Sequence, residues 1–410
     1  MKYVTQILKE SKTLLFSQFF VAIILIFQVS IVSKGLGLEK YGELAILTTF
    51  ISLIFRILHS RNNDVTLMAL NSLKSKIYLE SICFDILLGF LGTTVLLFVF
   101  NSELLSYFDI YSNLEYLNLF IVTRALILTM ETSKAHFTYF KKFSYLSFLE
   151  FFNVGIKFLL IYIIFQKEAS LGNYFLANSI ANILIFIITF FLSMKYFNFM
   201  NFNFRSLKKY FLLIKTQYKN QRIDQIAGIF AQHFDILILG YFSDVSSVGI
   251  YRIAKRLSEP VNYLINGLVP IIQNKLSISN KNTFNFSEFI KKFLFPLSIF
   301  GFLFYYFFGK KLLLFISGPE YVTADKVLLI LVIGQFIYLN TFWIRISLLF
   351  NNLIKKHAIS RGINTITFAF SSILLVPYYE AYGIAASMSL AVLIQKIYEY
   401  LIYRKNIYKY

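Results

Sequence analysis

The chain has 410 residues, of which 57% are hydrophobic and only 15% are charged. This composition excludes an ordinary soluble domain, in which about a quarter of the residues are charged. The net charge of +19 does not indicate nucleic-acid binding, because the basic residues lie in short clusters between apolar runs. That pattern is typical of the loops of membrane proteins, so we expect membrane lipids and no nucleic acid as partners.

Apolar runs of about 20 residues recur along the chain, which is the length that one membrane-spanning helix needs. We therefore predict an all-α polytopic membrane protein with about 12 transmembrane helices. The predicted spans are 13–32, 42–60, 81–100, 115–134, 146–165 and 174–194 in the first half, and 220–242, 248–273, 289–308, 324–350, 357–377 and 383–402 in the second. The first run has no small-residue cleavage site before or after it, so we interpret it as an uncleaved helix.

The most polar and basic connection lies between the two halves. It divides the chain into an N-terminal six-helix lobe (1–197), a basic cytoplasmic linker (198–219) and a C-terminal six-helix lobe (220–410). The segments GLGLEKYGELAIL (35–47) and LGYFSDVSSVGIYRIA (239–254) resemble each other and occupy corresponding positions in the two halves. Because six spans per half is an even number, the predicted repeats run parallel.

Loop charges predict the orientation of the chain. Every second connection between spans is rich in Lys and Arg. The remaining connections contain only six basic residues: Lys34, Lys40, Lys167, Lys310, Lys311 and Lys326. Cytoplasmic loops carry the excess of positive charge, so both termini are expected in the cytoplasm.

Five cations lie deep inside predicted spans, away from the loops. Arg124 is on span four and Lys157 is on span five, while Arg252, Lys255 and Arg256 lie on one face of span eight. A charge within a membrane is costly, so its default interpretation is a functional group that faces water or a counter-charge. Arg binds phosphate through two parallel hydrogen bonds and Lys acts as a point charge, so these five residues are predicted to bind an anionic substrate.

Asp235 is the acid of greatest interest. It lies on span seven at about the same depth as Lys255 on span eight, and a short turn joins the two helices. Two interpretations stay open: a structural ion pair, or a protonatable carboxylate whose pairing changes between the inward and outward states. Asp224 and His233 are secondary candidates for ion coupling.

Other charges lie close to predicted cytoplasmic ends of spans. Arg56, Arg345 and Lys396 are weaker candidates for substrate binding, because extension of the side chain to the membrane surface explains them equally well. Glu80 and Asp85 are expected to be solvated at that surface.

No signature of an enzyme, a metal site or a cofactor is present in the sequence. Cys83 is the only cysteine, the four histidines do not cluster, and no nucleotide-binding or nucleophile motif occurs. We therefore predict a protein that is not an enzyme and that uses no metal and no cofactor.

Four segments carry a resemblance to a known family. They are LGLEKYGELAIL (36–47), DILILGYFSDVSSVGIYRIAKRL (235–257), ISGPEYVTADKVLLIL (316–331) and YGIAASMSL (382–390). In this order the chain resembles the polysaccharide-transporter branch of the multidrug/oligosaccharidyl-lipid/polysaccharide exporter superfamily, the bacterial O-antigen and capsule repeat-unit flippases.

The resemblance implies two six-helix lobes around a central cavity and transport by alternating access across the bacterial inner membrane. It implies undecaprenyl-pyrophosphate carrying an oligosaccharide as substrate, for lipopolysaccharide or capsule synthesis. It further implies coupling to protons or sodium, and contact with the polysaccharide polymerase machinery.

Two other functions stay open. A drug or cation antiporter of the same superfamily is expected to have acids deep in the first lobe, where this chain has Arg124 and Lys157. A membrane polysaccharide polymerase is expected to have a large outer loop, whereas the longest predicted outer loops, 101–114 and 309–323, are short.

Overall fold

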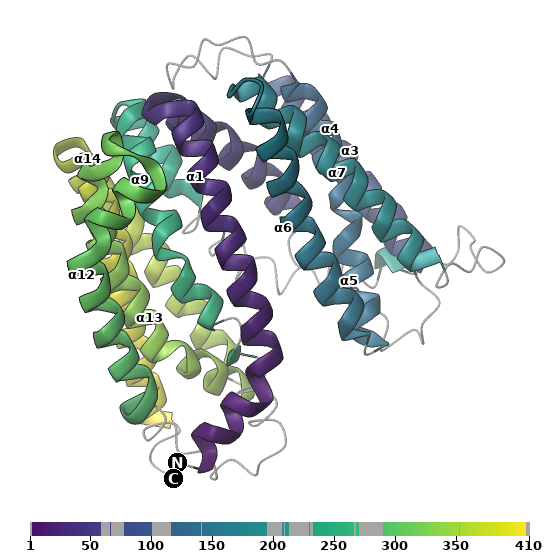
Figure 1. The fold of residues 1–410 in the computed structure, drawn as a ribbon. Helices are drawn as coiled ribbons and strands as arrows, with labels where there is room; N and C mark the ends of the chain where they lie inside the picture. The colour runs from purple at the N-terminus through teal and green to yellow at the C-terminus, as the bar shows by residue number, and fades with distance from the viewer. Residues whose placement is uncertain are drawn as a thin grey trace. The chain divides into compact units, whose positions relative to one another are not determined.

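The computed structural model describes residues 2–58, 78–100, 116–140, 142–194, 233–265, 290–351 and 353–406, with isolated positions between these ranges. Its elements are α1 (Lys2–Leu58), α3 (Tyr78–Phe100), α4 (Leu117–Ile127), α5 (Thr129–Tyr139), α6 (Phe143–Phe165), α7 (Leu171–Ser193), α9 (Val245–Ser258), the π-helical turn η4 (Ile290–Leu294), α12 (Phe295–Ser317), the 3-10 turn η5 (Pro319–Ala324), α13 (Asp325–Phe350) and α14 (Ile354–Asn406) (Figure 1). A short apolar helix, His233–Phe242, precedes α9. All these elements are helical, as the sequence predicts.

Within the described ranges, seven helices are long and apolar enough to cross a membrane. Two of them, Phe19–Leu58 with 40 residues and Lys355–Asn406 with 52 residues, are much longer than one crossing requires. Each contains a residue with non-helical backbone, Gly37 (φ 74°) in the first and Glu380 (φ 47°) in the second. These breaks fall between predicted spans one and two and between spans eleven and twelve, so each long helix holds two predicted spans.

Two predicted boundaries differ from the structure. Predicted span four is divided at Leu128 into α4 and α5. Predicted span nine ends at 308, but α12 continues to Ser317 because the exposed Lys310 and Lys311 do not interrupt it. Helix α12 ends where Gly318 adopts φ 103°, a conformation that favours glycine.

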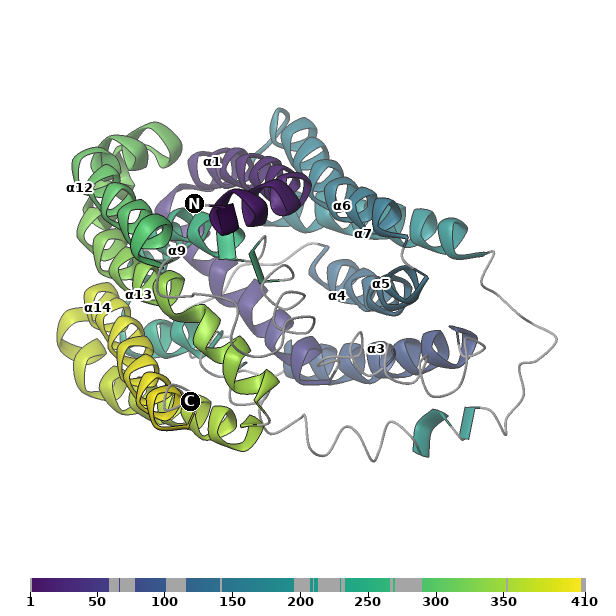
Figure 2. The same ribbon diagram turned by 90° about the horizontal axis from the view of Figure 1, so that it is seen from below.

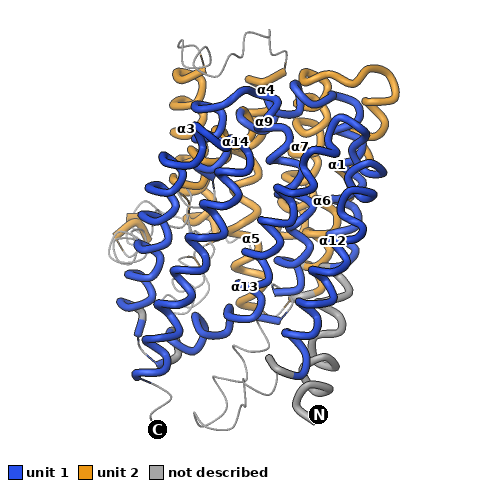
Figure 3. The backbone as a smooth tube through the Cα atoms, turned by 90° about the vertical axis from the view of Figure 1, so that its left-hand side faces the viewer, with its two compact units in different colours: residues 1–46, 230–410 blue, residues 47–229 orange. Residues whose placement is uncertain are grey.

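The chain folds into two compact units (Figure 3). Unit 1 contains residues 1–46 and 230–410, and unit 2 contains residues 47–229. The first part of α1 belongs to unit 1 because it binds the end of α12: Ser30 Oγ donates to the carbonyl of Ile316 at 2.5 Å, and Lys34 Nζ donates to that of Phe315 at 2.7 Å. The lobes predicted from the repeats, 1–197 and 220–410 with the linker 198–219, stay a prediction.

In unit 2, α7 packs against both α4 and α6, and α3 packs against α4 and α5 (Figure 2). The buried side chains between them include Ile127, Met130, Ala181 and Ile185. The outward faces are apolar, as Phe98 with 79% exposure shows. Large exposed apolar faces of this kind fit a lipid environment.

In unit 1, α13 packs against α9, α12 and α14 (Figure 1). Small residues bring the helices close together, since Gly334 of α13 lies against Ser389 of α14 and Gly301 of α12 lies against Phe336. Close helix packing through small residues is typical of membrane proteins, which gain little from burying apolar surface between helices.

The four segments behind the family resemblance contact one another in unit 1. The backbone N–H of Leu38 donates to Glu320 Oε2 at 3.2 Å, which joins the first segment to the third. Ser247 Oγ of the second segment donates at 2.7 Å to Oε2 of Glu380, which lies two residues before the fourth segment, and Tyr382 OH of the fourth donates to the carbonyl of Thr323 in the third at 3.3 Å. Segments far apart in sequence therefore form one polar cluster at the breaks of α1 and α14.

Two glycines permit the first and second segments to cross. A Cβ atom at Gly249 would lie 2.5 Å from the carbonyl oxygen of Leu38, and one at Gly42 would collide with the carbonyl of Val245. Both clashes involve backbone, which cannot rotate away. The two segments that echo each other in the sequence thus pack against each other through their glycines.

We expect Gly249→Ala to lower the melting temperature of the purified protein, because overpacking of this kind costs about 1–3 kcal/mol. Gly362→Ala is the matched control, since a Cβ there meets nothing within 4 Å. Equal melting temperatures for the two variants would contradict the close crossing.

Candidate functional site

The hairpin of helix His233–Phe242 and α9 positions the first group of charges, in unit 1. Asp244 ends the turn and caps α9, because its Oδ1 accepts a hydrogen bond from the backbone N–H of Ser247 at 2.9 Å. The tight turn predicted between spans seven and eight is therefore present.

Asp235 is fully buried at the centre of this hairpin. Its Oδ2 accepts hydrogen bonds from Lys255 Nζ and from Tyr251 OH, both at 2.5 Å. The two residues that the sequence analysis matched by depth are thus in contact, while the role of the pair in function stays a prediction. Tyr251 was not predicted, although it lies four residues before Lys255 and so on the same face of α9.

The other two cations of α9 differ from each other. Arg256 Nη1 lies 2.8 Å from Glu259 Oε2, so its charge is matched within one turn of helix. Arg252 is half-buried and has neither an ion pair nor a hydrogen bond among the described residues. Of the three cations on this helix, Arg252 is therefore the one that the described part of the chain leaves unmatched.

Unit 2 contains the second group of charges. Arg124 of α4 and Lys157 of α6 are half-buried, and each lies within electrostatic range of the other. Neither makes an ion pair or a hydrogen bond with any residue that the structure describes. Lys134 differs, because its Nζ lies 3.2 Å from Glu131 Oε1 and 3.8 Å from Glu150 Oε1.

The five predicted substrate-binding cations thus form two groups, each within its own unit. Asp224, the second predicted coupling residue, lies outside the described residues.

The expected solvation of Glu80 and Asp85 is wrong, and of the two interpretations of Lys396 the structure excludes extension to the surface. Lys396 is 3% exposed, and Asp85 and Glu80 are also buried. Distance from a span end does not determine exposure here, because α3 and α14 turn these side chains toward the protein interior rather than toward the surface. Asp85 Oδ2, for example, accepts a hydrogen bond from Thr132 Oγ1 of α5 at 2.5 Å.

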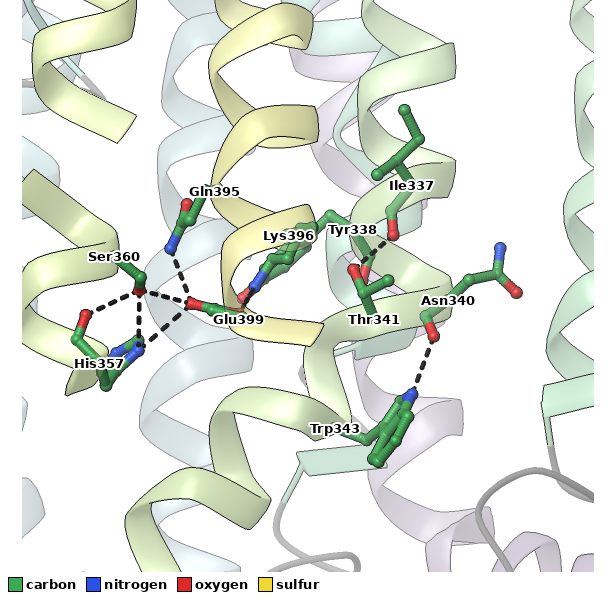
Figure 4. A network of polar contacts seen from close by, with 10 residues as sticks. All are labelled: Ile337, Tyr338, Asn340, Thr341, Trp343, His357, Ser360, Gln395, Lys396 and Glu399. Carbon is green, nitrogen blue, oxygen red and sulfur yellow. Dashed lines mark hydrogen bonds and ion pairs between the residues drawn. The ribbon is translucent and has the colours of Figure 1, made fainter. Parts of the chain in front are cut away.

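Lys396 belongs to a charged network that the sequence analysis missed (Figure 4). Its Nζ lies 2.6 Å from Oε2 of the buried Glu399. Glu399 Oε1 accepts from Ser360 Oγ at 2.8 Å and from Gln395 Nε2 at 3.0 Å, and His357 Nδ1 lies 3.3 Å from the same oxygen. The i, i+3 spacing of Lys396 and Glu399 was a signal for the pair, but nothing in the sequence places His357 beside it.

No protein-family model and no curated protein matches the sequence. Solved structures do match it over almost the whole chain. The lipid II flippase MurJ in an inward closed conformation has a TM-score of 0.77 at 15% identity, covering 96% of this chain and 87% of that one. An inward-facing multidrug-resistance MATE family transporter of the MOP superfamily has a TM-score of 0.74 at 11% identity, covering 96% and 98%. The chain has the fold of these transporters.

A MATE transporter from Vibrio cholerae shares the fold more distantly, with a TM-score of 0.56 at 10% identity over 100% of this chain and 99% of that one. The likeness shows that this chain shares its helical fold with a lipid II flippase and with MATE transporters. It agrees with the superfamily resemblance found in the sequence. Identities this low establish the fold alone, so the polysaccharide branch remains a proposal.

Proposed function

We propose that the chain is a flippase that moves undecaprenyl-pyrophosphate-linked oligosaccharide repeat units from the cytoplasmic to the outer leaflet of a bacterial inner membrane by alternating access. The observation that carries the proposal is the set of unmatched cations, Arg124 and Lys157 in unit 2 and Arg252 in unit 1. Each lies on a helix of a membrane fold, and none forms an ion pair or a hydrogen bond with a described residue. Glu131 is within electrostatic range of Arg124, and Asp235 and Glu259 are within range of Arg252, but none of these acids is in contact with the cation.

An unmatched cation inside a membrane protein is costly unless water or an anion reaches it. A lipid-linked pyrophosphate supplies such an anion, and its charge prevents it from crossing the hydrocarbon unaided. Arg124 and Arg252 provide planar guanidinium groups that bind phosphate oxygens in pairs, and Lys157 adds a point charge. The shared fold with MurJ, a lipid II flippase, supports a lipid-linked substrate.

A drug or cation antiporter is the second candidate, and the buried Asp85 favours it because a cationic drug requires an acid inside the protein. The MATE-like fold is compatible with it as well. We prefer the flippase because the hydroxyl of Thr132 already binds Asp85, whereas the groups left without a partner are cations.

The proposal is tested by expressing the full chain in a strain that lacks its own repeat-unit flippase. We expect surface glycan to return, and purified protein in vesicles to expose lipid-linked oligosaccharide to a glycan-degrading enzyme added outside. Resistance to cationic drugs without any surface glycan would overturn the flippase and favour the antiporter.

A further inference from the structure

A buried charged network joins the two halves of α14 (Figure 4). His357 and Ser360 precede the break at Glu380, and Lys396 and Glu399 follow it. Glu399 has 0% exposure, His357 2% and Lys396 3%. Buried charges in a membrane protein are rare, and they mark functional groups by default.

The carboxylate of Glu399 is surrounded by hydrogen-bond donors. It accepts hydrogen bonds from Ser360, Gln395 and Lys396, and His357 Nδ1 lies 3.3 Å from Oε1. A carboxylate only accepts, so the proton of a neutral His357 must be on Nδ1. This leaves Nε2 as a bare acceptor, and Nε2 is buried without a hydrogen-bond partner among the described residues.

The charges in contact with Glu399 are few. On α14 they are His357 and Lys396, and the hydrogen bonds and ion pairs that Glu399 forms with described residues all come from its own helix. On α13, Tyr338 lies under Lys396, with Nζ 4.9 Å from the ring centroid. Helix α9 also packs on α14, but through Tyr251 at Met388, about three turns from Glu399.

Three further basic residues on α14, Lys355, Lys356 and Arg361, make no contact with this carboxylate. Lys356 Nζ instead donates to Asn406 Oδ1 at 2.8 Å.

The geometry favours a proton over a metal cation. A metal ion such as sodium needs several oxygen ligands, whereas here the ammonium of Lys396 and N–H groups already occupy the carboxylate. The described residues also contain no group of three His, Cys, Asp or Glu side chains that could hold a metal ion.

We propose that His357, Glu399 and Lys396 form a proton-binding site that controls how α14 packs on α13, and that this site couples transport to protons. The coupling part rests on the proposed function. A proton from water adds to His357 Nε2, which raises the charge of the neutral cluster by one. The imidazolium and the ammonium of Lys396 then share a single carboxylate.

Two buried cations that share one carboxylate are not fully neutralised, which is energetically costly. Protonation therefore shifts the conformational equilibrium of the protein toward an arrangement in which Lys396 reaches water or another anion. Because Lys396 lies over Tyr338, this movement changes the contact between α13 and α14.

The fluorescence of a native tryptophan can report this movement. Trp343 is the only tryptophan, and it lies on α13 with its ring 5.0 Å from that of Tyr403 on α14. We would titrate its fluorescence in the purified full chain in lipid nanodiscs from about pH 5 to about pH 9, the range in which histidine changes charge. We expect a single transition in the wild type and none in His357→Gln.

Glu399→Gln should alter the fluorescence transition, because the His357 ring then faces a neutral amide in place of the carboxylate 3.3 Å away. If that variant does not fold, Glu399→Gln combined with Lys396→Met removes the pair and keeps the cluster uncharged. Glu168→Gln, at an exposed acid, is the control and should titrate as the wild type does.

A flat wild-type titration, or the same transition in His357→Gln, would overturn the site. A response to sodium at constant ionic strength that Glu399→Gln abolishes would overturn the choice of proton. The titration does not depend on the substrate. A normal titration in a protein that moves no lipid-linked glycan would reject the proposed function and leave the proton site standing.

Discussion

Asp235→Ala should destabilise the protein by about 3–5 kcal/mol, because it leaves Lys255 as a cation without its buried counter-charge. Tyr251 OH would lose its acceptor as well, since both groups donate to the same Oδ2. The expected result is a lower melting temperature of the purified protein and less folded protein in the membrane. Glu168→Ala, which removes an exposed acid, should change neither.

Removing both charges of the pair separates its two interpretations. Asp235→Leu combined with Lys255→Met replaces the ion pair with apolar side chains, which is often neutral for stability. If the double variant folds and transports, Asp235 and Lys255 form a structural pair. If it folds but does not transport, the carboxylate takes part in the transport cycle.

The charge swap Asp235→Lys with Lys255→Asp should recover part of the stability lost in Asp235→Ala. A swap no more stable than the worse single variant would show that the contact contributes little.

The Asp235–Lys255 contact could be predicted because two conditions held in the sequence. Both residues lie in apolar runs whose ends are clear, and a turn of a few residues fixes the register of the two helices. Depth in the membrane then determines which side chains meet. The break at Gly37 was likewise visible, because a glycine and a polar stretch separate two apolar runs.

The network around Glu399 could not be predicted in this way. His357 and Glu399 lie on different spans with a break at Glu380 between them, so no short turn relates their depths. Lys396 and Asp85 lie near span ends, where a charged side chain can extend to water. Which face of a helix is buried depends on its neighbours, and a single apolar sequence carries little periodic signal when lipid covers the outer face.

Removal of the unmatched cations is the second change with a large expected effect. It should reduce transport without reducing stability. Arg124→Ala, Lys157→Ala and Arg252→Ala each remove a charge that forms no ion pair and no hydrogen bond with a described residue. Folding should therefore be unaffected or slightly favoured. Transport should fall by about ten- to hundredfold for each, because a hydrogen bond to a charged group contributes about 1.5–3 kcal/mol.

The matched cations provide the internal comparison. Lys255→Ala and Arg256→Ala should lower the melting temperature, because each leaves an acid unpaired. Lys167→Ala and Lys310→Ala, at exposed positions, should change neither stability nor transport. Arg124→Lys should remain impaired if the guanidinium binds two phosphate oxygens, and should recover if charge alone matters.

The measurement is surface glycan in the flippase-deficient strain, normalised to the amount of folded protein. Full transport in all three variants of the unmatched cations would refute recognition of a pyrophosphate by these residues. The buried Asp85 would then become the principal candidate for substrate binding, because an antiporter for cationic drugs needs an acid where a flippase needs a cation.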